Sequence, residues 1–182
     1  MTSEREIIDA TQRWLERAVI GLNLCPFAKA VHAKQQVRYV VSDATEAEGL
    51  LADLLHELRF LADADPARVE TTLLIHPYAL ADFLDYNDFL EIADAAVSEL
   101  ALDGELQVAS FHPDYRFADS LPDDIENFSN RSPYPTLHLL RESSIDKAVE
   151  AFPDAASIYE RNIDTLRRLG RDGWRKLWEG EA

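Results

Sequence analysis

The 182-residue sequence has one cysteine, six glycines and far fewer basic than acidic residues. With Cys25 alone, the chain cannot form an internal disulfide, which fits a reducing compartment. Six glycines leave little material for a phosphate-binding loop, and the Gly-x-Gly-x-x-Gly and Walker patterns are absent. The formal net charge of -16 argues against binding to nucleic acid or to an anionic membrane, because both depend on positive charge.

Long apolar runs are also lacking. No segment approaches the roughly 20 apolar residues that a membrane-spanning helix needs. The charged N-terminal segment has no apolar stretch of the kind found in signal peptides. We therefore expect a cytoplasmic protein that contacts no membrane. Its 47% of hydrophobic residues is an ordinary globular composition, and the length suits a single domain over residues 1–182.

Hydrophobic periodicity predicts a sheet of about four strands among helices. The strands are expected at 36–42, 69–75, 106–111 and 136–140. Helices are expected at 3–20, 45–61, 78–100, 144–152, 154–169 and 172–178. The predicted fold class is therefore α+β, with a small, mostly antiparallel sheet, helices packed on it and a C-terminal helical extension.

From the second strand onward, the order β-α-β-β-α matches a ferredoxin-like unit without its last strand. If the first strand fills that position, the sheet is a permuted version of that fold. The second and third strands are then parallel, and the fourth lies antiparallel between them. The ends of the two parallel strands and the start of the fourth would share one edge of the sheet, beneath the segment 112–135.

This topology would gather three histidines at that edge, His76, His112 and His138. Imidazole transfers protons near neutral pH, and three imidazoles can form an open catalytic metal site. We therefore consider all three as acid/base residues or metal ligands, with Asp114 and Asp124 orienting the rings. Their spacing matches no zinc signature, however. The simpler interpretation is structural, with His-Pro pairs ending strands and ring nitrogens bonded to loop backbone.

The segment 112–135 is long for a loop, and such loops in compact domains are usually functional or disordered. Its aromatic residues and prolines favour order. Polar residues suited to an anionic ligand lie in and after it: Asn127, Asn130, Arg131, Tyr134 and Arg141. A guanidinium in a stiff loop can hold a carboxylate or phosphate through two hydrogen bonds. Alternatively, Arg131 pairs with acidic residues of the loop and the asparagines form turns.

Cys25 lies in the apolar connector GLNLCPFA. A lone intracellular cysteine with histidines elsewhere in the chain can act as a nucleophile. Nothing in the neighbouring sequence obviously activates the thiol, and free cysteine is among the most buried residue types. A structural role is therefore the simpler expectation.

The C-terminal segment concentrates positive charge in an acidic chain. Its basic residues are Arg161, Arg167, Arg168, Arg171, Arg175 and Lys176. Trp174 and Trp178, one helical turn apart, add an apolar anchor. We expect this segment to dock on a row of acidic residues at 82–94, within the chain or between the subunits of a homo-oligomer. The acidic row itself is most simply a solvated helix face.

Five segments of the chain together resemble a known family. They are LNLCPFA (22–28), LLIHP (73–77), DFLDYNDFL (82–90), QVASFHPDYRF (107–117) and NRSPYPTLHLLRE (130–142). The last two are long and unusual enough to be specific. The chain is similar to an uncharacterised bacterial family, domain of unknown function 1415. That resemblance implies a cytosolic bacterial protein but supplies no activity, ligand, cofactor or catalytic residue.

Two functions remain open on these residues. One is an enzyme acting on a small anionic molecule, with Arg131 holding the anion and a histidine serving as acid/base or metal ligand. The other is a non-catalytic metabolite-binding or protein-interaction module that uses the same pocket. A third interpretation makes the loop a structural clasp, so that Arg131→Ala lowers stability and affects no ligand.

Overall fold

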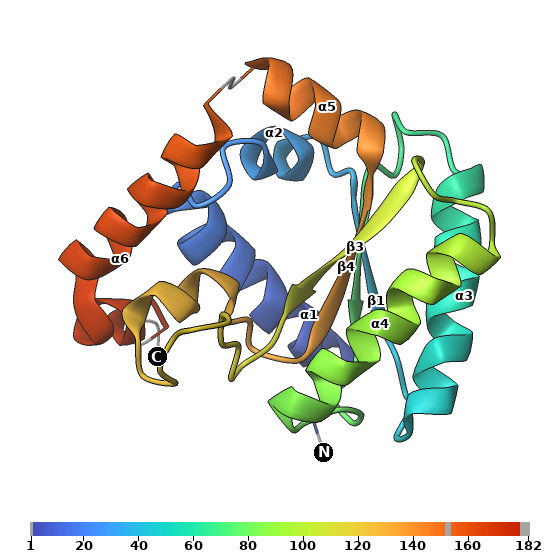
Figure 1. Cartoon of the computed structure of the whole chain (residues 1–182), viewed down its shortest axis with the longest axis horizontal. Helices are drawn as coiled ribbons and strands as arrows, with labels where there is room; N and C mark the ends of the chain where they lie inside the picture. Colours follow the sequence, from blue (N-terminus) through green and yellow to red (C-terminus); the bar gives the residue numbers. More distant parts are fainter. Residues whose placement is uncertain (1, 152–153, 179–182) are drawn as a thin grey trace.

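In a computed structural model of the chain, described for residues 2–151 and 154–178, helices cover both faces of one open sheet (Figure 1). The strands are β1 (Val37–Val41), β2 (Thr71–Ile75), β3 (Leu106–Phe111) and β4 (Thr136–Arg141). Each observed boundary lies within two residues of its expected position. The predicted α+β class is confirmed.

The strand order is β1-β2-β4-β3, the order expected for the permuted ferredoxin-like sheet. As predicted, β4 lies antiparallel between β2 and β3. β1 pairs with β2 in parallel, whereas the edge strand of a ferredoxin-like sheet runs antiparallel to its neighbour. A parallel pair needs a crossover connection, and α3 (Ala47–Asp63) supplies it. The sheet is therefore mixed, with two antiparallel pairs and one parallel pair.

The main core lies between the sheet and two helices, α3 and α4 (Phe83–Glu99), which stand to the right of the sheet in Figure 1. Both helices bury one apolar face, including Leu54 and Phe89, against Leu74 of β2 and its neighbours. Asp82 begins α4 by accepting hydrogen bonds from the first backbone N–H groups of the helix. The helix then continues without a break to Glu99.

A second layer lies on the other face of the sheet, to the left in Figure 1. It consists of α1 (Glu4–Trp14), the π-helical turn η1 (Leu15–Ile20), α2 (Ala28–Ala33), α5 (Glu142–Ala151) and α6 (Ala155–Lys176). Its core is smaller and centres on Trp14, whose ring meets that of Phe111 at a centroid distance of 5.0 Å. Phe152, the expected end of the 144–152 helix, lies outside the described residues.

Two elements differ from those expected. Inside the 112–135 segment a short 3-10 helix, η2 (Ile125–Asn130), breaks the expected loop. The two C-terminal helices expected from the sequence form one element, α6, kinked at Gly170, where a φ of 69° suits glycine.

None of the helices in the part of the chain that the structure describes is both long and apolar enough to cross a membrane.

Candidate functional site

The alternation of side chains along β4 separates the three candidate histidines. Leu137 and Leu139 enter the core under α3 and α4. Successive strand residues point to opposite faces, so His138 faces the other layer, where it lines a cavity. His76 and His112 instead follow β2 and β3 on the α3/α4 face. The prediction that all three histidines meet is therefore wrong for His138, although His76 and His112 do lie together.

His76 and His112 flank the buried ring of Tyr86, with centroid distances of 5.7 Å and 4.9 Å. Both imidazoles are fully buried. His76 donates from Nδ1 to a carbonyl of the following turn at 2.9 Å. His112 accepts at Nδ1 from the backbone N–H of Asp114 (3.0 Å), so Nε2 donates to the carbonyl of Leu80 (3.1 Å). These contacts are the ones expected of the structural interpretation.

Burial also keeps these two rings neutral. Removal from water lowers the pKa of His76 to about 4 and lowers that of His112 from its ordinary value. Within residues 2–151 and 154–178, no three His, Cys, Asp or Glu side chains group closely enough to hold a metal ion. Asp124, expected to orient a ring, instead accepts from the backbone N–H of Leu121.

Arg131 bonds to other residues of the 112–135 segment, to which it belongs. Its Nε donates to the carbonyl of Tyr115 at 3.1 Å, and its Nη2 donates to the carbonyl of Pro122 at 2.5 Å. The guanidinium lies over the ring of Phe128, 4.5 Å from the centroid. One side chain thus joins three points of the segment, which is the geometry of a clasp.

Arg131→Ala should lower the free energy of unfolding by about 2–3 kcal/mol, because it removes hydrogen bonds from a charged donor and a cation–π contact. Urea unfolding measures the loss. Arg68→Ala is the matched control, since Arg68 is exposed and its side chain bonds no described residue. If Arg131→Ala lowers the free energy of unfolding no more than Arg68→Ala does, Arg131 does not hold the segment together.

The two asparagines are engaged in the same way. Asn127 is fully buried; its Oδ1 accepts from the N–H of Phe117, and its Nδ2 donates to the carbonyl of Leu121. Asn130 donates to the carbonyl of Ser110, near the end of β3. Their amides therefore hold the segment in shape and dock it on the sheet.

Arg141 does not join Arg131, because it ends β4, whereas the segment 112–135 meets the beginning of that strand. Its guanidinium donates to the carbonyls of Ala64 and Val69 after α3. The hydroxyl of Tyr134 makes no hydrogen bond to any described residue. The five residues expected to bind an anion are thus not assembled around one open pocket.

The basic residues of α6 contact the 112–135 segment. Arg167 Nε donates to Glu126 Oε1 at 3.0 Å, and Arg171 donates to the carbonyl of Asp123. The rings of Trp174 and Phe128 meet at a centroid distance of 5.6 Å. Within the chain, the basic helix therefore docks on η2 and not on the acidic row of α4. A homo-oligomer through α6 stays a prediction.

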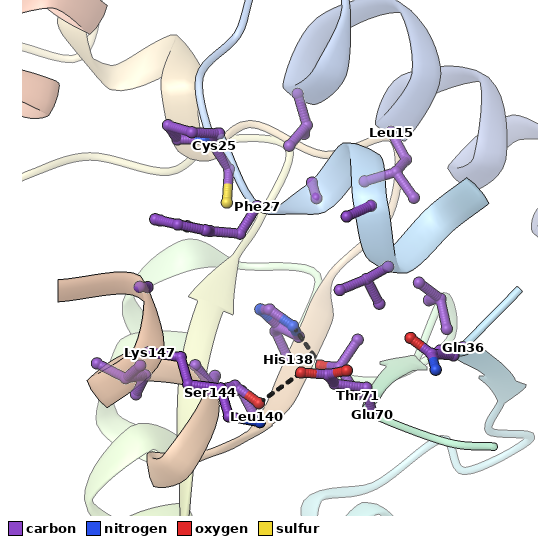
Figure 2. Close-up of a pocket in the computed structure, with 18 of the residues that line it drawn as sticks. Leu15, Cys25, Phe27, Gln36, Glu70, Thr71, His138, Leu140, Ser144 and Lys147 are labelled. Atoms are coloured by element: carbon purple, nitrogen blue, oxygen red, sulfur yellow. Dashed lines mark hydrogen bonds between the residues drawn. The ribbon is translucent and has the colours of Figure 1, made fainter. Parts of the chain in front are cut away.

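A cavity of about 650 Å³ lies on the face of the sheet that His138 occupies, between the strands and helices α1, η1, α2 and α5 (Figure 2). That volume falls within the range of small-molecule sites. Its walls are mainly apolar, with Leu15, Phe27 and Phe111 among them. The polar side chains are few: Thr71 and His138 on the sheet with Glu70 just before β2, Ser144 and Lys147 on α5, and Lys34 and Gln36 between α2 and β1.

The hydrogen bonds of Thr71 determine the tautomer of His138. Thr71 Oγ1 lies 2.7 Å from the carbonyl oxygen of Leu139 and 2.7 Å from His138 Nε2. The single hydroxyl proton must go to the carbonyl, which can only accept. Nε2 therefore carries a proton and donates to Oγ1, and Nδ1 is an unprotonated acceptor. Nδ1 makes no hydrogen bond to any described residue.

Burial lowers the pKa of His138 to about 4, so the ring is neutral at pH 7. Around it the charge balance differs from that of the whole chain. Among the described residues that line the cavity, Lys34 and Lys147 are basic and Glu70 alone is acidic. The Glu70 carboxylate accepts from the hydroxyl of Ser144 at 2.9 Å. In a chain with a net charge of -16, this cavity has a local positive excess.

Reasoning from the sequence alone missed most of this site. Glu70, Thr71 and Ser144 carry no motif; Glu70 and Thr71 are adjacent at the start of β2, whereas Ser144 lies in α5, far along the chain. One signal was available, because His138 alternates with two leucines and must face away from the core that they enter. Cys25, expected to be buried, is partly exposed and lines the cavity.

Residues 6–176 match a family described as "Protein of unknown function (DUF1415)". No curated protein and no solved structure matches the chain.

Proposed function

Because the chain belongs to the DUF1415 family, whose description assigns no activity, we propose its function from the geometry of the cavity. The protein binds a small molecule that has an apolar body, a hydroxyl or N–H group on that body, and an anionic head. The apolar walls take the body, and the lysines at the cavity favour the head.

The observation that carries this proposal is the unpartnered Nδ1 of His138. His138 is half-buried and lines the cavity, so its free Nδ1 can accept a hydrogen bond from a ligand. One such bond contributes about 0.5–1.5 kcal/mol to binding. The ring cannot turn to satisfy Nδ1 elsewhere without breaking its bond to Thr71. The cavity thus selects for a donor at one point of an otherwise apolar molecule.

Binding is better supported than acid/base catalysis. A general base works best with a pKa near the working pH, and burial holds that of His138 at about 4. The enzyme that the sequence suggested also needs Arg131 to be available, yet its Nε and Nη2 bond the 112–135 segment. A non-catalytic small-molecule site therefore fits the contacts best.

The dye 8-anilinonaphthalene-1-sulfonate is a suitable probe, because it combines apolar rings, an N–H donor and an anionic sulfonate. We expect saturable one-to-one binding by fluorescence titration. His138→Phe keeps a ring but removes the acceptor, and should weaken the affinity about 5- to 15-fold, the value of one hydrogen bond.

Two Ala→Trp variants locate the dye. Ala148 of α5 lines the cavity, so Ala148→Trp should fill it and abolish binding. Ala52 is exposed on α3, on the opposite side of the sheet, and Ala52→Trp should bind normally. Equal binding by both variants would place the dye elsewhere and refute the proposed site.

A further inference from the structure

A second cavity of about 360 Å³ adjoins the first on the side of η2 and α6. The two cavities share four lining residues, Val19, Cys25, Phe111 and Ile158. Shared walls place the cavities side by side, with these four side chains at the boundary. We call this group of four the junction.

The first cavity has a polar end and an apolar end. In Figure 2, the Ser144–Glu70 hydrogen bond and Lys147 lie on one side of His138, and Cys25 lies on the other. Glu70 and Lys147 therefore lie apart from Cys25, and a ligand with its anionic head near Lys147 would extend past His138 toward Cys25.

The second cavity suits an apolar tail. None of the described residues that line it is charged, and Leu24 and Phe117 form part of its wall. Each of the asparagines that line it already donates one amide N–H to the backbone, Asn130 to the carbonyl of Ser110 and Asn162 to that of Leu24. What remains for a ligand there is mainly apolar surface.

We propose that the two cavities form one elongated site for a long-chain hydroxy acid. The carboxylate lies near Lys147, the hydroxyl donates to His138 Nδ1, and the alkyl tail passes Cys25 into the second cavity. This inference rests on the proposed function and adds to it the shape and chemical class of the ligand.

Cys25 makes the inference testable, because it is the only cysteine of the chain and lies at the junction. The experiment measures the rate at which N-ethylmaleimide labels Cys25, by mass spectrometry, with saturating 3-hydroxyoctanoate or 3-hydroxyhexadecanoate. We expect both acids to displace the dye from the first cavity. Only the longer acid should reach the junction and slow the labelling, by tenfold or more.

The outcomes separate the two proposals. If the dye does not bind in the first cavity, the proposed function fails. If the dye binds in the first cavity but neither acid displaces it, the hydroxy-acid class fails alone. If the longer acid displaces the dye and leaves the labelling rate unchanged, the tail does not pass Cys25 and the elongated site is wrong.

A blocking variant gives a second readout. Ser129 lines the second cavity but not the first, so Ser129→Phe should shorten the site from the far end. In the wild type, affinity should rise about fourfold for each added methylene that the protein buries. In the variant, the shorter acid should bind unchanged and the gain with chain length should be lost. A preserved gain would contradict the inference.

Discussion

Tyr86→Phe is expected to lower the free energy of unfolding by about 2–4 kcal/mol, although it removes a single oxygen atom. Tyr86 belongs to α4, and its side chain is fully buried. Its hydroxyl donates to the carbonyl of Thr136 at 2.8 Å and accepts from the N–H of Phe111 at 3.0 Å. The hydroxyl thus joins the end of β3 to the start of β4, and its loss leaves two backbone groups without that partner.

Urea unfolding measures this loss, and an unchanged m value would show that the folded state keeps its compactness. Tyr78→Phe is the matched control, because Tyr78 is 41% exposed and its hydroxyl bonds no described residue. The control should change the stability by less than about 0.5 kcal/mol. If the two variants are equally stable, the hydroxyl of Tyr86 does not join the strands.

Acidification should destabilise the protein well before its carboxylates titrate, because the folded chain holds the buried His76 and the half-buried His138 as neutral rings. Burial lowers the pKa of each from 6.5 to about 4. Above pH 6.5 the folded and unfolded chains both hold these rings neutral. As the pH falls from 6.5 toward 4, the unfolded chain binds protons that the folded chain does not, so the free energy of unfolding falls.

The expected slope is about 1.4 kcal/mol per pH unit for each histidine, and the total loss reaches up to about 3 kcal/mol for each. These losses are large beside a typical domain stability of about 5–15 kcal/mol. Protonation of carboxylates acts in the opposite direction, because it relieves the self-repulsion of a chain with a net charge of -16. The histidine contribution is therefore measured as a difference between variants.

Urea unfolding at a series of pH values from 7 to 4.5 gives that difference. His138→Phe should reduce the slope of the free energy of unfolding against pH by about 1.4 kcal/mol per pH unit, because it removes one of the two rings. His56→Gln is the control: that ring is 75% exposed on α3, so its removal should leave the slope unchanged. A slope in His138→Phe equal to that of the wild type would show that the folded chain does not hold His138 as a neutral ring.

The strands and their order were predictable because their signals are local. Apolar runs bounded by turn residues mark each strand, and the short connection between α4 and β3 allows few pairings. The direction of β1 was not predictable in the same way. It depends on how α3 returns the chain to the sheet, and hence on packing between segments that are distant in the sequence.

The positions of the three histidines were only partly predictable from neighbouring residues. The placement of His76 and His112 at one edge followed from the strand order alone. The face of His138 also followed from alternation along β4, but only the packed helices make that face a cavity instead of solvent. Arg131 gives the converse case, because its polar surroundings suggested an anion site and the fold supplied carbonyl partners from its own loop.

The sequence by itself determined the four strands and most of the helices, although not α2 (Ala28–Ala33). It also determined the absence of an internal disulfide and the unfavourable charge for nucleic acid. Those properties depend on composition and on the spacing of neighbouring residues. Only the tertiary structure decided that Thr71, Ser144 and Cys25 surround His138, because they come from separate elements. Their approach is set by the packing of α1, α2 and α5 on the sheet, and no spacing along the chain encodes it.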